Sequence, residues 1–364
     1  MKGSRLFSLD LLRGLDMFLL TVVGPFVVAL DRTVGLPVGV LGQFRHGWEC
    51  FTLWDIIMPM FIFMCGAAVP LALEKRLENG RSGWTYWRHV LGRVCLLWFL
   101  GMVAQGRLAT LDPLVISPFN NTLQSIAVGY LVAAVVLLIP SRRIQIAVPI
   151  ALAVAYAVLL QAFGDYTLPG NFAQKVENAV VPLLTPDGSR ALEIADPGYT
   201  WWLTSMMFAA MTLCGAEATR ILRGSGRETV RFVRLLVLGA VLLTVGLLLS
   251  PWIPVIKPIY TLTFTAQAMG WCCLSLALLY GLTDILKARR GFGLFILFGQ
   301  TALLAYMLVE VFPCVLSAFS AAVTEGVPRL FGKSAHPLLR WAVETTLLVV
   351  ILHFRRAASM KKER

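Results

Sequence analysis

The sequence predicts an all-α polytopic membrane protein with about ten transmembrane helices and both termini in the cytoplasm. Hydrophobic residues make up 58% of the 364 residues and charged residues only 14%, whereas charged residues near a quarter are usual in soluble domains. The mean hydropathy is +0.75, and apolar runs long enough to cross a bilayer follow one another along the chain. Positive charges also gather in alternate loops, as expected for a chain that crosses a membrane repeatedly.

Each expected span is close to the roughly 20 residues that a bilayer requires. The segment 314–322 is apolar but short, which favours a re-entrant or interfacial piece. Residues 164–198 are rich in Pro, Gly, Asn and Asp and predict an external loop with a short helix near 172–180. Without an internal repeat, residues 1–364 are interpreted as a single domain. The expected spans are 7–30, 52–73, 87–106, 121–139, 144–163, 199–222, 232–253, 259–286, 292–313 and 338–354.

The loop charges predict the orientation. One set of alternate loops contains Arg142-Arg143, the arginines between 220 and 234, and the basic C-terminal tail. The other set is sparse in Lys and Arg and includes the loop of His46. Because positive loops stay in the cytoplasm, His46 is expected outside. The net charge of +12 is thereby assigned to membrane topology, and no nucleic-acid partner is predicted.

The stretch from Gln43 to Leu73 carries the strongest chemical pattern. His46 lies in a polar loop just before a span, and Asp55 lies about one turn inside that span. A carboxylate beside an imidazole fixes the tautomer of the ring and raises its basicity, as a general base or an acyl-accepting nucleophile requires. Two simpler interpretations stay open: His46 is a solvated loop residue, and Asp55 caps the first helical turn with Thr52.

The first span opens with three charged residues at helical spacing, Asp10, Arg13 and Asp16. Neighbouring members share a helix face, and charges at this depth are costly unless they are paired. The pattern is typical of a self-neutralising cluster at the inner interface. The alternative is that Arg13 holds an anionic group that enters from the cytoplasm.

Further polar residues from different spans are expected at the outer level. Together they favour a central outward-facing cavity, whereas each alone is an ordinary helix-end residue. Trp201 and Trp202 fit an interfacial aromatic belt and would also suit a sugar. The four histidines are too scattered for a metal site, so none is predicted. The polar residues are Asn121, Gln124, Lys257, Glu310 and Glu344.

Five segments resemble one family in the same order: SLDLLRGLDM, WECFTLWDIIMPMFIFMCGAAVP, NNTLQSIAVGYL, PWIPVIKPIYTLTF and LFGQTALLAYM. The chain is similar over most of its length to the heparan-α-glucosaminide N-acetyltransferase family and its bacterial relatives, a branch of the transmembrane acyltransferases. The segment of the second span is the most specific part, and the long outer loop is not covered.

The resemblance implies transfer of acetyl from cytoplasmic acetyl-CoA to an amino sugar or glycan outside a bacterial inner membrane. His46 is then the acyl acceptor or general base and Asp55 orients it. Arg13 and cytoplasmic basic residues would hold the CoA phosphates, because Arg matches phosphate oxygens bidentately. Membrane lipid is the surrounding partner, and a homo-oligomer is left open. The remaining candidates for binding acyl-CoA or substrate are Asp10, Asn121, Gln124, Lys257 and Gln300.

Two positions depart from the family's pattern. The histidine of RHGW is one residue nearer the tryptophan than in the usual His-x-x-Trp, and the first span reads TVVGP where relatives carry an asparagine. Such an asparagine would donate to a developing oxyanion. An amino-sugar permease, in which the same polar groups bind substrate without chemistry, is therefore the second hypothesis. A membrane scaffold without a small-molecule site is the third.

Overall fold

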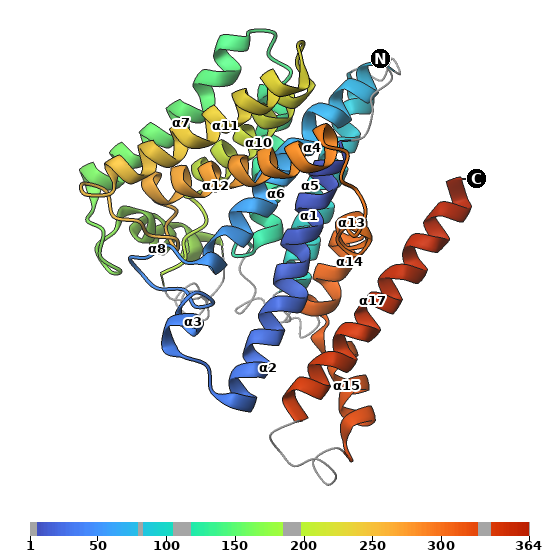
Figure 1. Cartoon of the computed structure of the whole chain (residues 1–364). Helices are drawn as coiled ribbons and strands as arrows, with labels where there is room; N and C mark the ends of the chain where they lie inside the picture. Colours follow the sequence, from blue (N-terminus) through green and yellow to red (C-terminus); the bar gives the residue numbers. More distant parts are fainter. Residues whose placement is uncertain (1–5, 79–82, 105–117, 185–197, 327–335, 364) are drawn as a thin grey trace. The chain divides into compact units, whose positions relative to one another are not determined.

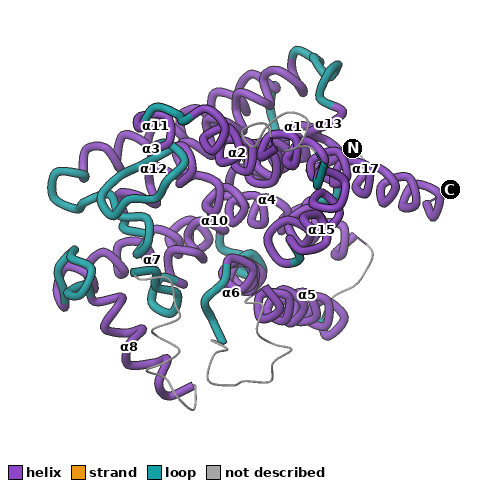
Figure 2. The backbone as a smooth tube through the Cα atoms, turned by 90° about the horizontal axis from the view of Figure 1, so that it is seen from below, coloured by secondary structure: helices purple, strands orange, loops and turns teal. Residues whose placement is uncertain are grey.

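The computed structural model describes residues 6–78, 83–104, 118–184, 198–326 and 336–363. Within these ranges every regular element is a helix, as Figure 2 shows, and the single β-bridge joins Glu49 and Ile256. The fold divides into two compact units. The first unit comprises residues 1–46, 52–57 and 278–364, and the second comprises 47–51 and 58–277.

The helices confirm a multi-pass α-helical membrane protein. Seven helices in the described ranges are long and apolar enough to cross a membrane, and a bent pair makes an eighth if it is one span. They correspond to eight of the ten expected spans. The expected spans 121–139 and 199–222 coincide with α6 (Thr122–Val136) and α10 (Ser205–Arg223), which are not among the seven. The total of about ten therefore stays a prediction.

The first unit is built around the first span. Its elements are α1 (Phe7–Phe18), the π-helix η1 (Leu19–Val23), α2 (Gly24–Val34), α3 (Val38–Gly42) and the 3₁₀-helix η2 (Leu53–Ile56). After Leu278 follow the π-helix η4 (Gly281–Ile285), α13 (Gly293–Gln300), α14 (Ala302–Tyr306), the π-helix η5 (Met307–Val311), α15 (Pro313–Thr324) and α17 (His336–Glu363). In Figure 1, α17 runs beside α15 and α2, and the three pack together.

Close backbone packing joins α1 to α13. A Cβ atom on Gly14 would lie 1.7 Å from the carbonyl oxygen of Phe295, and one on Gly299 would lie 2.2 Å from that of Asp10. Only glycine fits at such distances, so these two residues let the helices touch. Phe18 then packs edge-on against Phe295, with ring centroids 5.1 Å apart. The first span is thereby anchored along its N-terminal half.

Two spans of this unit are irregular. In the first, the π-helix η1 directly precedes Pro25. Because proline has no N–H and its ring clashes with the carbonyl four residues earlier, a local π-bulge accommodates it without breaking the span. The expected span 292–313 instead bends by 81° between α13 and α14. Thr301 adopts a non-helical conformation there and its hydroxyl donates to the carbonyl oxygen of Leu297 at 2.7 Å.

The second unit contains most of the remaining helices. They are α4 (Ile57–Glu78, whose first residue belongs to the first unit), α5 (Trp84–Ala104), α6, α7 (Arg142–Phe163), α8 (Phe172–Leu184), α10, α11 (Glu228–Leu249) and α12 (Leu262–Tyr280, which ends in the first unit). The helix α10 packs against α6, α7 and α11, and α5 lies beside α6 (Figure 2). Hydrogen bonds add to the apolar packing: Thr219 donates to the carbonyl oxygen of Ala67, and Tyr86 to that of Ala134.

The long loop after α7 contains the expected short helix, α8, which runs four residues further than 172–180. The segment 185–197 of this loop lies outside the described residues. The buried carboxylate of Glu177 on α8 accepts hydrogen bonds from the backbone N–H groups of Trp201 and Trp202, at 3.1 and 3.2 Å. Glu177 therefore holds the start of the next helical segment against α8.

Candidate active site

Asp55 occupies the first turn of the second span and is 1% exposed. Its Oδ2 atom accepts hydrogen bonds from the backbone N–H and the hydroxyl of Thr52, both at 2.8 Å. Thr52 and Asp55 thus form a capping box, in which two side chains satisfy the donors that a helix start leaves open. The expected capping role of Asp55 is confirmed.

The same carboxylate also contacts His46. Its Oδ1 atom lies 2.6 Å from Nδ1 of the imidazole, and the side chain of His46 is 37% exposed. A proton on Nδ1 is held by this contact, so the neutral ring keeps its lone pair on Nε2. Both interpretations of Asp55 therefore hold at once, because one oxygen caps the helix and the other orients the histidine.

The loop of His46 is fixed to the start of the span by backbone contacts. Gln43 accepts the N–H of Trp54 at its carbonyl oxygen at 3.0 Å and the N–H of Leu53 at Oε1 at 3.2 Å. The rings of Phe44 and Trp54 pack with centroids 5.5 Å apart. The Trp54 ring lies so close to Gly24 that a Cβ atom there would be 2.2 Å from it. The loop that carries His46 is therefore fixed to the start of the second span.

The charged group at the start of the first span is only partly paired. Arg13 lies 3.5 Å from Asp10, as expected, but Asp16 does not join them. Asp16 is 1% exposed, and its two carboxyl oxygens have no hydrogen-bond partner in the described ranges. The expected self-neutralising cluster of three is wrong at this residue, because the third position turns into the packed interior of the unit.

Basic residues lie next to the start of α1. The carboxylate of Asp284 accepts the N–H of Ser8 at 3.1 Å and caps this helix. Arg289 lies 3.7 Å from Asp284 and stands over the ring of Phe7 at 5.2 Å. Arg290 is exposed in the same loop. The start of α1 therefore lies next to arginines that come from outside the first span.

The other expected binding residues have local structural roles or lie apart in the chain. Asn121 caps α6 by accepting the N–H of Leu123 at 2.9 Å. Gln124 is fully buried, and its amide bonds the backbone of Asn120 and Pro118. Lys257, 4% exposed, belongs to the second unit with them, whereas Gln300 ends α13 in the first unit and is exposed.

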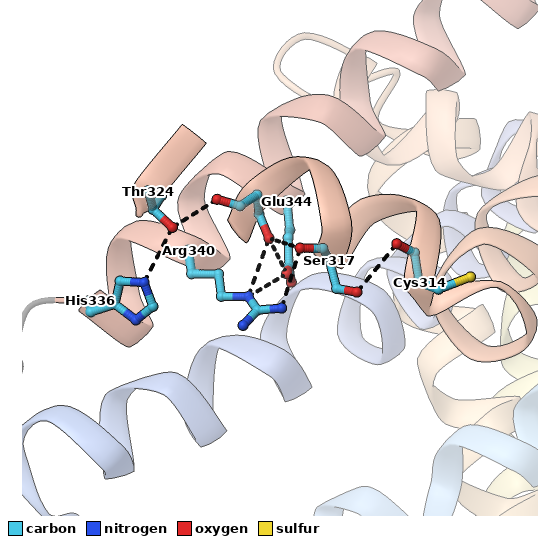
Figure 3. A network of polar contacts seen from close by, with 7 residues as sticks. Cys314, Ser317, Thr324, His336, Arg340 and Glu344 are labelled. Carbon is cyan, nitrogen blue, oxygen red and sulfur yellow. Dashed lines mark hydrogen bonds and ion pairs between the residues drawn. The ribbon is translucent and has the colours of Figure 1, made fainter. Parts of the chain in front are cut away.

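The first unit contains a cavity of about 530 Å³, and Phe44 and Trp54 of the histidine region help to line it. The sequence pointed to Glu310 and Glu344 but not to the two arginines, Arg32 and Arg340, that line the same cavity. Arg340 lies 3.2 Å from Glu344 (Figure 3), and both contact the hydroxyl of Ser320. The charged residues and tryptophans of the cavity wall are Arg32, Trp54, Glu310, Arg340, Trp341 and Glu344.

No group of three or more potential metal ligands occurs within the described ranges. The first unit combines a histidine–carboxylate pair with a charged, aromatic cavity.

The fold and the site together define a class: a multi-pass helical membrane protein with a buried aspartate against an exposed histidine at the start of a span. Residues 5–170 are similar to a family described as "Domain of unknown function (DUF5009)". The match covers less than half of the chain. It includes His46, Asp55 and the charged start of the first span, but neither Lys257 nor the bent helix pair. A search of curated proteins gave no match.

Proposed function

We propose that the protein is a transmembrane acyltransferase that moves acetyl from cytoplasmic acetyl-CoA to an amino sugar or glycan on the outer face. The observation that carries the proposal is the 2.6 Å contact between His46 and a carboxylate that is 1% exposed. A buried carboxylate must be paired or hydrogen-bonded, and here one oxygen caps the helix while the other contacts the imidazole. Pairs of this kind activate amines, hydroxyls and thiols for acyl transfer.

His46 acts at Nε2 in this proposal. With its Nδ1 proton held by Asp55, Nε2 accepts the proton that the acceptor amine loses as the new C–N bond forms and the C–S bond of the thioester breaks. The thiolate of CoA leaves and is protonated in turn. If the imidazole instead takes the acetyl group first, the same nitrogen forms the bond. Asp55 stabilises the positive charge that develops on the ring in either case.

The start of α1 is the proposed entry of acetyl-CoA. The pyrophosphate and phosphate of CoA need several cations, and Arg289 and Arg290 supply them beside the ring of Phe7. Arg13, about two turns deeper and 28% exposed, is available along the same helix although Asp10 balances its charge. These residues fit an anionic donor that approaches from the cytoplasm.

The proposed topology completes this scheme. About ten spans, each of roughly 20 residues, would place both termini in the cytoplasm of a bacterium and His46 outside its inner membrane. The basis is the distribution of Lys and Arg between alternate loops.

A permease for an amino sugar is the second candidate, and the bent pair α13–α14 favours it. Discontinuous spans near a polar cavity are typical of transporters, and the described part of the chain has a span broken by 81° and three π-helical segments. In this alternative the His46–Asp55 pair binds the sugar and transfers nothing.

One experiment separates the two candidates. Purified protein is reconstituted in vesicles with acetyl-CoA on the side of the termini and ¹⁴C-glucosamine on the other, and both compartments are analysed. The enzyme proposal expects N-acetylated sugar that depends on acetyl-CoA. Unmodified labelled sugar that crosses equally well without acetyl-CoA would refute it and support the permease.

A further inference from the structure

The cavity of the first unit carries a balanced set of charges. Two arginines and two glutamates line it, so its formal charge is zero. Two of the four already neutralise each other, since Arg340 and Glu344 lie 3.2 Å apart (Figure 3) and both bond the hydroxyl of Ser320. A polyanion such as CoA finds no net attraction there.

The other two charges are uncompensated. Neither Arg32 on α2 nor Glu310 on η5 forms an ion pair or a side-chain hydrogen bond in the described part of the chain, and both are exposed in this cavity. An arginine can bind a carboxylate or phosphate, and a carboxylate can bind an ammonium group. A ligand that carries both an anionic group and an ammonium group would pair with Arg32 and Glu310 at once.

Aromatic side chains form the rest of the wall, and they are fixed in place. Trp341 donates its indole N–H to the carbonyl oxygen of Val22 at 3.0 Å and packs on Phe26 with centroids 4.7 Å apart. Trp54 is held by Phe44. Rigid indoles offer flat apolar faces to the body of a ligand, and a cavity of about 530 Å³ has the size of a small-molecule site.

We propose that this cavity binds a small zwitterion with a primary ammonium group and an anionic group, in which Glu310 binds the ammonium and Arg32 the anion. This inference rests on the proposed acetyl transfer, for which the cavity would be the acceptor site, and it narrows the acceptor to an amine that also carries a negative charge. The bound ammonium loses one proton to water before it attacks the thioester, and the neutral amine loses its second proton to His46 as the C–N bond forms. The same chemistry occurs in a soluble amino-sugar phosphate and in the phosphoethanolamine headgroup of a lipid.

Calorimetry on the full-length protein in detergent, without acetyl-CoA, tests the site. The probes are glucosamine 6-phosphate, glucosamine, glucose 6-phosphate and glucose, which differ only in the amine and the phosphate. Loss of either charge should weaken binding about tenfold or more, since hydrogen bonds to charged groups contribute about 1.5 to 3 kcal/mol. Glycerophosphoethanolamine is the headgroup probe; tighter binding of it than of glucosamine 6-phosphate would assign the site to lipid.

Two variants assign the roles. Glu310→Gln should weaken only the probes that carry an amine, and Arg32→Gln only those that carry a phosphate. Glu325→Gln, an exposed carboxylate that does not line the cavity, is the matched control and should change nothing. The proposal is overturned if neither zwitterion binds, if the four sugars bind alike, or if Glu310→Gln weakens all four equally.

Calorimetry together with the vesicle assay of acetyl transfer separates this inference from the proposed function. Zwitterion binding without any acetyl transfer would refute the proposed enzyme activity and support the binding site. Acetyl transfer to an amino sugar without a phosphate, and no zwitterion binding, would support the proposed enzyme activity and refute the binding site.

Discussion

Oδ1 of Asp55 lies 2.6 Å from Nδ1 of His46 while Oδ2 of the same carboxylate caps the start of the second span through Thr52. A helix cap holds the carboxylate of the proposed catalytic pair rigidly, because its position is set by hydrogen bonds to the helix start. The geometry of the histidine is therefore coupled to the integrity of one helix terminus.

Thr52→Ala and Asp55→Asn distinguish the two roles of this carboxylate. Thr52→Ala removes one capping bond and should cost about 0.5 to 2 kcal/mol in the free energy of unfolding, with the His46 contact retained. Asp55→Asn should lower stability similarly and also reduce acetyl transfer by at least about tenfold, because a neutral amide cannot stabilise an imidazolium. Thermal unfolding in detergent and initial rates measure the two effects. Equal rate losses in both variants would contradict the division.

The contact between α1 and α13 should tolerate no side chain at Gly14. A Cβ atom would lie 1.7 Å from the Phe295 oxygen, so Gly14→Ala must separate the helices and is expected to lower the unfolding temperature or abolish recovery of folded protein. Gly92→Ala on α5 is the control, since no atom lies within 4 Å of its added Cβ. It should be neutral or stabilising by up to about 1 kcal/mol. Equal behaviour of the two variants would refute the close packing.

Glu177 predicts a pH dependence of stability. Burial raises the pKa of its carboxyl from 4.5 to about 7, although the N–H groups of Trp201 and Trp202 oppose the rise. The folded chain therefore binds a proton more readily than the unfolded chain, and the free energy of unfolding should fall as pH increases from about 4.5 to about 7.

Glu177→Gln should remove this pH-dependent fall in the free energy of unfolding, which is at most about 3 kcal/mol. Unfolding temperatures of the wild type and the variant, measured from pH 4 to pH 9, should converge at the acid end and separate as pH rises. Parallel curves over the whole range would show that Glu177 does not titrate in this window.

The proposed donor entry predicts a role for Arg290 in acetyl-CoA binding. Arg290→Gln should weaken acetyl-CoA several-fold and reduce the dependence of its affinity on salt, because one phosphate contact is lost. Arg143→Gln removes an exposed arginine from the second unit and should leave the affinity unchanged. Equal losses in both variants would indicate a general effect of surface charge and would refute the entry site.

Composition and apolar length were sufficient to predict the fold class, because a span without internal hydrogen bonding is not viable in lipid. They did not predict the break at Thr301, and Pro25 alone did not show whether the span would kink or absorb the proline in a π-helix. The pair of His46 and Asp55 followed from the sequence because the residues are nine positions apart at a helix start. The partnership of Arg340 with Ser320, across two helices, left no local signal.

The same limits explain Asp16 and Gln124. Helical spacing correctly placed Arg13 beside Asp10 but could not show that Asp16 is buried among packed helices. Gln124 was expected to bind substrate, and its amide instead satisfies the loop before α6. In the sequence, a polar residue at a helix end fits a bond to the backbone and a bond to a ligand equally well. Only the contacts in the structure distinguish the two roles.

The most direct test of the central claim is the rate of acetyl transfer to glucosamine by His46→Gln, beside wild type and His353→Gln. His353 is an exposed histidine of α17 far along the chain and serves as the control. We predict that His46→Gln lowers kcat by about hundredfold or more with unchanged thermal stability and acetyl-CoA affinity, while His353→Gln retains the wild-type rate. Wild-type activity in His46→Gln would contradict the proposed role of this histidine.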